Sequence, residues 1–147
     1  MEGQPTVWTS AFRFVLRYHS AFLIESEAFL AKQHDEVLRS SAKGGKRTAA
    51  DDLNIWTVND FYPNRLRYSM FTTLYSEFEF YINKACQEFE SFPQYRLRLK
   101  EVAGDGIHRS YTYLRKVIQI EHPYADESWS NLTDLNKLRN VIRCFYG

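Results

Sequence analysis

The stretch from residue 6 to about residue 39 contains neither glycine nor proline. Its large apolar residues recur at three- and four-residue steps, which places them on one broad face of a helix. These residues are Trp8, Phe12, Val15, Leu16, Phe22, Leu23, Phe29, Leu30 and Val37. The spacing therefore predicts one long helix over residues 6–39, and any fold of this chain has to accommodate it.

A second helix is expected from about residue 64 to residue 92, where Pro93 ends it because a proline disfavours helical backbone in the residue before it. Its apolar stripe consists of Leu66, Met70, Leu74, Phe78, Tyr81, Ile82, Ala85 and Phe89. Between the two helices, glycines and an Asn-Asp pair break the pattern. Residues 40–64 are therefore expected to form the longest loop, which is mobile or functional.

The C-terminal part contains three shorter expected helices. The first covers residues 95–102, and the second runs from Ile107 to about Ile120, with Asp105 as its cap and His122-Pro123 at its end. The third begins near Ser128, a second capping residue, and ends near residue 146. No segment alternates convincingly with a period of two residues, so the sequence predicts an all-α fold, a bundle of four to five helices.

Length and composition narrow the class of protein. A chain of 147 residues with 11 Phe, 10 Tyr and 3 Trp is expected to fold as one domain around a single core. Its formal charge of +1 excludes a broadly basic protein that coats nucleic acid, so any polyanion site must be a local patch. Cys86 and Cys144 form no disulfide framework and no apolar run can span a bilayer, so the expected location is the cytoplasm.

The last expected helix carries the most specific chemical signal. Its apolar residues, at helical spacing, are Trp129, Leu132, Leu135, Leu138, Ile142 and Phe145. This pattern places Arg139 and Asn140 beside the apolar seam. Cys144 follows four residues after Asn140.

The spacing matches an Arg-Asn-x-x-x-His motif in which Cys144 stands at the place of the histidine. Further upstream, Gly104-Asp105-Gly106, Tyr113-Leu114-Arg115-Lys116-Val117 and Trp129 follow in a characteristic order. This ordered set, over roughly residues 66–144, resembles the HEPN domains, a superfamily of small helical RNases and nucleotide-binding modules, and within it a bacterial RNase and toxin-like group. The resemblance implies a HEPN-like homodimer in which both motifs face one cleft and cleave RNA without a metal ion or cofactor.

In such a cleft, the 2′-hydroxyl of RNA attacks its own phosphate and leaves a cyclic phosphate. The reaction requires a fixed cation near phosphorus and a group that transfers protons near neutral pH. Arg139 suits the first role because its planar guanidinium donates two parallel hydrogen bonds to phosphate. Asn140 would orient neighbouring groups, and Lys137 and Arg143 are the expected RNA-binding cations. Glu79 either holds Arg139 through an ion pair or is an ordinary surface glutamate.

Cys144 is the departure from the family pattern. Imidazole titrates near pH 6.5, whereas a free thiol has a pKa of about 8.5 and is a weak hydrogen-bond donor. Three interpretations are open: a thiolate that accepts a proton, an inert and half-buried residue, or the mark of a lost activity. We therefore expect RNA cleavage to be weak or absent.

An alternative function belongs to a different class. The same helices would form a non-catalytic dimeric interaction domain that binds a protein such as a nucleotidyltransferase-type antitoxin. The Arg139-Asn140 pair favours an RNA-cleaving toxin or defence module, and Cys144 favours the interaction domain.

Two basic segments and the histidines complete the candidates. The segment of residues 43–47 either offers backbone N–H groups of Gly44 and Gly45 to phosphates or is a solvated turn. Arg96, Arg98 and Lys100 form either a small patch or the solvated face of a short helix. The four histidines lack the paired spacing of metal ligands, so neither a metal nor an organic cofactor is expected.

Overall fold

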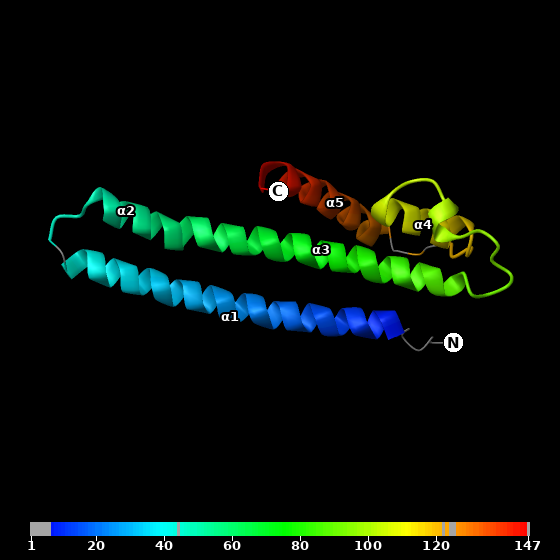
Figure 1. Cartoon of the computed structure of the whole chain (residues 1–147), viewed down its shortest axis with the longest axis horizontal. Helices are drawn as coiled ribbons and strands as arrows, with labels where there is room; N and C mark the ends of the chain where they lie inside the picture. Colours follow the sequence, from blue (N-terminus) through cyan, green and yellow to red (C-terminus); the bar gives the residue numbers. More distant parts are fainter. Residues whose placement is uncertain (1–6, 44, 122, 124–125, 147) are drawn as a thin grey trace. The chain divides into compact units, whose positions relative to one another are not determined.

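The computed structural model describes residues 7–43, 45–121, 123 and 126–146, with the side chains of residues 7–9 and 146 excepted (Figure 1). Within these ranges the regular elements are all helical, which confirms the all-α prediction. They are α1 (Val7–Lys43), α2 (Ala49–Trp56), a π-helical turn (Thr57–Phe61), α3 (Tyr62–Phe89), a 3-10 turn (Leu99–Glu101), α4 (Gly106–Lys116) and α5 (Asp126–Tyr146). A search of the described helices for one able to cross a bilayer finds none.

The elements belong to two compact units. The first unit comprises Met1–Val15 and Thr73–Gly147, and so includes the start of α1, the end of α3, and α4 and α5. The second unit comprises Leu16–Thr72, with the remainder of α1, α2 and the start of α3. Within the second unit, Arg67 on α3 donates from Nε to Glu27 Oε1 on α1 at 2.7 Å.

The expected loop over residues 40–64 is wrong, because most of this segment is helical. α1 continues to Lys43, and Thr48 begins α2 through a capping box. The Thr48 hydroxyl oxygen accepts from the Asp51 backbone N–H at 3.3 Å, and the Asp51 carboxylate accepts from the Thr48 N–H at 2.9 Å. These reciprocal bonds satisfy two donors at the helix start, and the hydrogen bonds from Thr48 lower the pKa of Asp51.

Pro63 lies inside this helical stretch because a π-helical turn precedes it. A proline ring normally clashes with the carbonyl one turn earlier and has no N–H to donate. Here the Tyr62 N–H donates to the Thr57 carbonyl, five residues back, so the turn just before the proline is widened. The extra residue in this turn accommodates the proline, so the helix continues from α2 into α3.

The basic segment near Lys43 gives no support to a phosphate loop. Arg47 Nε lies 2.5 Å from Asp52 Oδ1, so its guanidinium is engaged at the first turn of α2. Gly44 lies outside the described residues. The solvated turn is therefore the better interpretation for the described part of this segment.

The core of the first unit gathers around α4. It consists of Cys86, Leu99, Val102, Tyr113, Leu114 and Ile118. Ser110 on α4 is fully buried and donates its hydroxyl to Asn83 Oδ1 on α3 at 2.6 Å, so α4 is held on α3 by a polar contact as well as by apolar packing.

Three of the expected boundaries in this unit need correction. The expected helix 95–102 shrinks to the 3-10 turn, in which Leu99 is buried while Leu97 before it is exposed. α4 ends at Lys116, and Gln119 has a positive φ of 65°. Asp105 occupies the cap position, yet its side chain makes no capping hydrogen bond. Ser128 lies inside α5, which begins at Asp126, and His122 lies outside the described residues.

Candidate functional site

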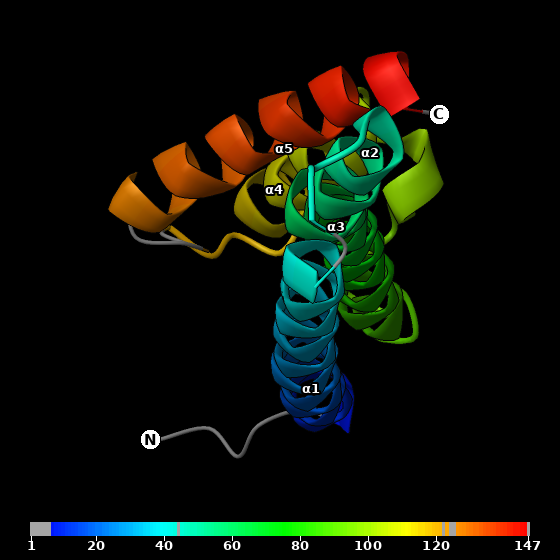
Figure 2. The ribbon, with the colours of Figure 1, turned by 90° about the vertical axis from the view of Figure 1, so that its left-hand side faces the viewer.

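The site forms where α5 crosses α3 in the first unit. Figure 2 shows α5 inclined to the part of α3 that belongs to the same unit. Arg139 Nη1 on α5 donates to Glu79 Oε2 on α3 at 2.7 Å. The two side chains are only 15% and 25% exposed, so the pair is largely screened from water. The expected ion pair between these residues is confirmed, and the surface-glutamate alternative is wrong.

An aromatic ring lies against the guanidinium of Arg139. The Arg139 guanidinium carbon lies 4.8 Å from the centroid of the Tyr75 ring, within the range of a cation–π contact. Burial raises the pKa of Tyr75 to about 12, so its phenol stays neutral near neutral pH. Tyr75 was not among the site residues predicted from the sequence. The signal was available, because Tyr75 precedes Glu79 by four residues and so shares its face of α3.

Asn140 accepts hydrogen bonds from the two guanidinium nitrogens that do not bond to Glu79. Arg139 Nε and Nη2 both donate to Asn140 Oδ1, at 3.3 and 3.1 Å. With the bond to Glu79, three of the five N–H donors of Arg139 are engaged within the described residues. One N–H on each terminal nitrogen is left to bind an external acceptor.

The first residue of α4, Gly106, packs against the Glu79 carboxylate. A Cβ atom at Gly106 would lie 3.1 Å from Glu79 Oε1, and the residue has a φ of +48°, which favours glycine. The Glu79 carboxylate therefore sits against the N-terminus of α4, where the helix dipole favours negative charge. The Gly-rich helix start was recognised in the sequence, but its contact with Glu79 was not.

The other motif residues lie outside this cluster. Cys144 is an exposed free thiol, so the half-buried interpretation is wrong. It follows Asn140 by four residues and so shares that side of α5. Arg143 is exposed, and Lys137 pairs with Asp134 of its own helix at 2.8 Å. Among the described residues, Arg139 makes no ion pair or hydrogen bond with these three side chains.

A different side of α5 is apolar and exposed. Leu135, Leu138, Val141 and Phe145 are between 40% and 77% exposed, whereas Ile142 is buried. Large apolar side chains gathered on one face of a helix are typical of a contact surface.

The described residues contain no group of three or more His, Cys, Asp or Glu side chains able to hold a metal ion. Comparison of the chain with protein-family models, with curated proteins and with solved structures finds no match. The HEPN resemblance therefore rests on the motif residues themselves.

Proposed function

We propose that this chain is a HEPN-like RNA-binding module of a cytoplasmic toxin or defence system, with Arg139 and Asn140 at the phosphate of the RNA. Its cleavage activity is weak or absent because a thiol stands at the position of the motif histidine. The contact of Arg139 with Glu79, Tyr75 and Asn140 carries the proposal. A solvated surface arginine has no need of three partners from two helices, whereas a phosphate-binding arginine gains from being fixed in advance.

The charges in the site determine how phosphate binds. Glu79 offsets the charge of Arg139, so the pair attracts anions less than a free arginine does. The two remaining N–H donors instead give directed hydrogen bonds to phosphate oxygens. During cleavage the 2′-oxygen bonds to phosphorus and the 5′-oxygen leaves, so one proton is removed and one is supplied. Cys144, one turn from Asn140 on α5, is the residue that would have to transfer a proton, whereas the amide of Asn140 does not titrate and serves to orient Arg139.

The proposal includes a homodimer. The exposed apolar side of α5, formed by Leu135, Leu138, Val141 and Phe145, is a surface on which a second copy can pack. The shared cleft that the HEPN resemblance implies requires the α5 helices of two copies to lie side by side, and a two-fold contact along this side would place them so. Sedimentation at micromolar concentration should then give twice the chain mass of 17.4 kDa, and a 17.4 kDa species alone would refute the dimer.

The second candidate is the non-catalytic interaction domain. Two observations favour it: the apolar side of α5 suits a protein partner as well as a second copy, and Glu79 already neutralises Arg139. In this function the motif cluster is a structural contact that holds α5 on α3, and the partner is a protein such as a nucleotidyltransferase-type antitoxin.

Restoring the histidine separates the two candidates. Cys144→His should raise the cleavage of single-stranded RNA in the presence of a chelator by about a hundred-fold or more, the typical contribution of a general acid–base group. The increase should vanish in the double variant with Arg139→Ala. Ser130→His is the matched control, since it adds the same imidazole to an exposed position of α5 away from the motif. Equal cleavage by the parent and by Cys144→His would favour the interaction domain.

A further inference from the structure

The loop between α3 and α4 carries a local excess of positive charge. Residues 91–100 contain Arg96, Arg98 and Lys100 and no carboxylate, in a chain whose net charge is only +1. All three cationic residues are exposed. This segment belongs to the same compact unit as Glu79 and Arg139.

The backbone of this loop is held in place by the two nearest carboxylates. Glu90 Oε1 accepts from the Leu99 backbone N–H at 2.8 Å, and Glu101 Oε2 accepts from the Arg98 backbone N–H at 2.8 Å. Both carboxylates therefore bind peptide groups. Within the described residues, no ion pair joins a carboxylate to Arg96, Arg98 or Lys100.

The alternating sequence sorts the side chains of the loop into two sets. Leu99 is buried in the core and Tyr95 packs beside it, with its ring centroid 6.0 Å from that of Phe89. Arg96 and Arg98 are both exposed, so they lie on the solvent side of the loop. The two arginines are two residues apart, so their Cα atoms lie within about 7 Å of each other, a spacing comparable to that of neighbouring phosphates along an extended strand.

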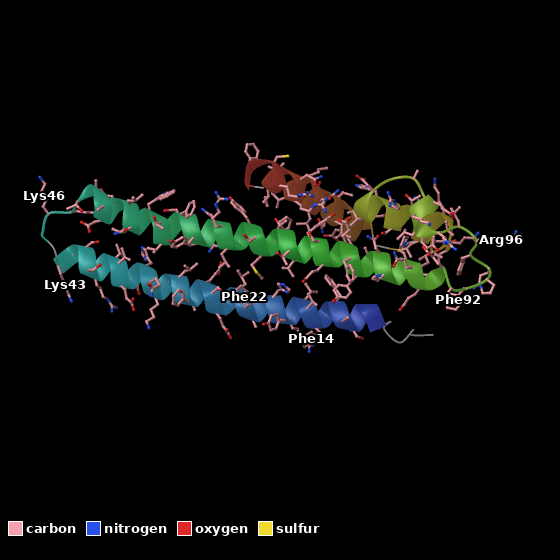
Figure 3. All side chains as sticks on the ribbon, viewed as in Figure 1. Phe14, Phe22, Lys43, Lys46, Phe92 and Arg96 are labelled. Carbon is pink, nitrogen blue, oxygen red and sulfur yellow. The ribbon has the colours of Figure 1, made fainter. Side chains whose placement is uncertain are left out.

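An aromatic ring lies at the start of the same loop. Phe92 is 49% exposed, and Leu97 is 44% exposed. Figure 3 shows Phe92 and Arg96 on the loop that follows α3, with Arg96 extending away from the ribbon. A single exposed ring among cations is typical of proteins that stack a base of single-stranded nucleic acid while binding its phosphates.

We propose that this loop, residues 91–100, is a second contact for single-stranded RNA, in which Arg96, Arg98 and Lys100 bind phosphates and Phe92 stacks on a base. The inference deepens the proposed function and rests on it for the identity of the ligand. Ten residues of α3 separate Glu79 from Phe89, about 15 Å along the helix, so a strand held at the motif reaches the loop within a few nucleotides. The loop thereby fixes which phosphate lies at Arg139.

The test measures binding without cleavage. The probe is a short fluorescent oligouridylate with 2′-O-methyl groups, which cannot undergo attack by the 2′-oxygen, and fluorescence anisotropy is recorded over a range of salt concentrations. The triple variant Arg96→Gln/Arg98→Gln/Lys100→Gln should bind at least about ten-fold more weakly. Its slope of log affinity against log salt should fall by about 2, since each phosphate contact on a single strand contributes about 0.7.

The matched control removes the same residue types from exposed positions of α1. Arg17→Gln/Lys32→Gln/Arg39→Gln should retain the parent slope to within about 0.7, the contribution of one contact. Gln94→Arg adds a cation to the loop and should strengthen binding and raise the slope by about 0.7, a gain that misfolding could not produce. Equal slopes for the parent and the loop triple variant would overturn the proposal.

Phe92→Ser separates stacking from charge. It should weaken oligouridylate binding roughly five-fold or more and leave the binding of inorganic polyphosphate unchanged, because polyphosphate has no base to stack. Equal losses for both probes would overturn the stacking role. If the loop binds phosphatidylserine vesicles and no oligonucleotide, the RNA assignment is wrong. If the loop residues contribute to RNA binding but the Cys144→His variant does not cleave RNA, the second contact is supported. Only the catalytic part of the proposed function is then refuted.

Discussion

A double-mutant cycle on Glu79 and Arg139 should show that their contact stabilises the fold. Arg139→Ala removes a charge-assisted hydrogen bond worth about 1.5–3 kcal/mol and a cation–π contact worth about 0.5–1 kcal/mol. The expected loss of stability is about 2–4 kcal/mol, or roughly 5–15 °C in Tm for a chain of this size. With the two side chains 15% and 25% exposed, the coupling energy should be about 1–2 kcal/mol, above that of exposed pairs and below that of fully buried ones.

The assay is urea denaturation followed by circular dichroism of the parent, Glu79→Ala, Arg139→Ala and the double variant. The control is the same cycle on Asp134 and Lys137, an exposed pair three residues apart on α5. Its coupling should be only about 0.2–0.5 kcal/mol. If the Glu79–Arg139 coupling is no larger than that of the control pair, α5 is not fixed on α3 by this contact, and the argument for a preorganised arginine fails.

Three further predictions follow from buried groups and from one glycine. The Tyr113 hydroxyl is buried and has no hydrogen-bond partner among the described residues. Tyr113→Phe should therefore raise the free energy of unfolding by about 1 kcal/mol in the same denaturation assay. A loss of stability would show that the hydroxyl is bonded. Burial raises the pKa of the Cys86 thiol to about 12. A chromogenic thiol reagent at about pH 8 should therefore react with one thiol of the folded protein, that of the exposed Cys144, and with a second only in denaturant. Because the unfolded thiol ionises first, the stability from this group should decline as the pH rises from about 9 to about 12, and Cys86→Ala should reduce that decline. Gly106→Ala should cost about 1–2 kcal/mol and reduce the cleavage gained by Cys144→His, since a Cβ would press on Glu79; unchanged stability and activity would contradict that contact.

Long-range periodicity made the helices predictable, and local capping made their ends harder to place. The stripes of the two long helices gave α1 and most of α3, because each repeats over many turns. The segment 40–64 was misread because its glycines and Pro63 are turn signals. The competing signals were the Thr48-x-x-Asp51 capping box and the π-helical turn, and only the first of these can be read from a sequence.

The candidate site was predictable in its parts and not in its full composition. The motif resemblance identified Arg139 and Asn140, and it placed Glu79 on a helix near them. Tyr75 escaped notice because an aromatic residue on a helix is usually core, and nothing local distinguishes one that supports a guanidinium. The contact of Gly106 with Glu79 joins residues 27 positions apart in the chain, so it depends on how α4 packs on α3 and cannot be read from spacing.

The distance between two copies of Cys144 tests most directly whether a pair of motifs shares one cleft. Cys144 is exposed and Cys86 is buried, so a spin label on the folded protein reports position 144 without substitution. Helices in contact lie 8–10 Å apart, so two labels across one cleft should be separated by less than about 30 Å, including the label arms. We expect a narrow distribution in that range for the parent and its loss in Leu138→Asp, which places a charge in the apolar side of α5. A dimer with labels well beyond that distance, or no dipolar coupling at concentrations where RNA is bound, would contradict the shared cleft.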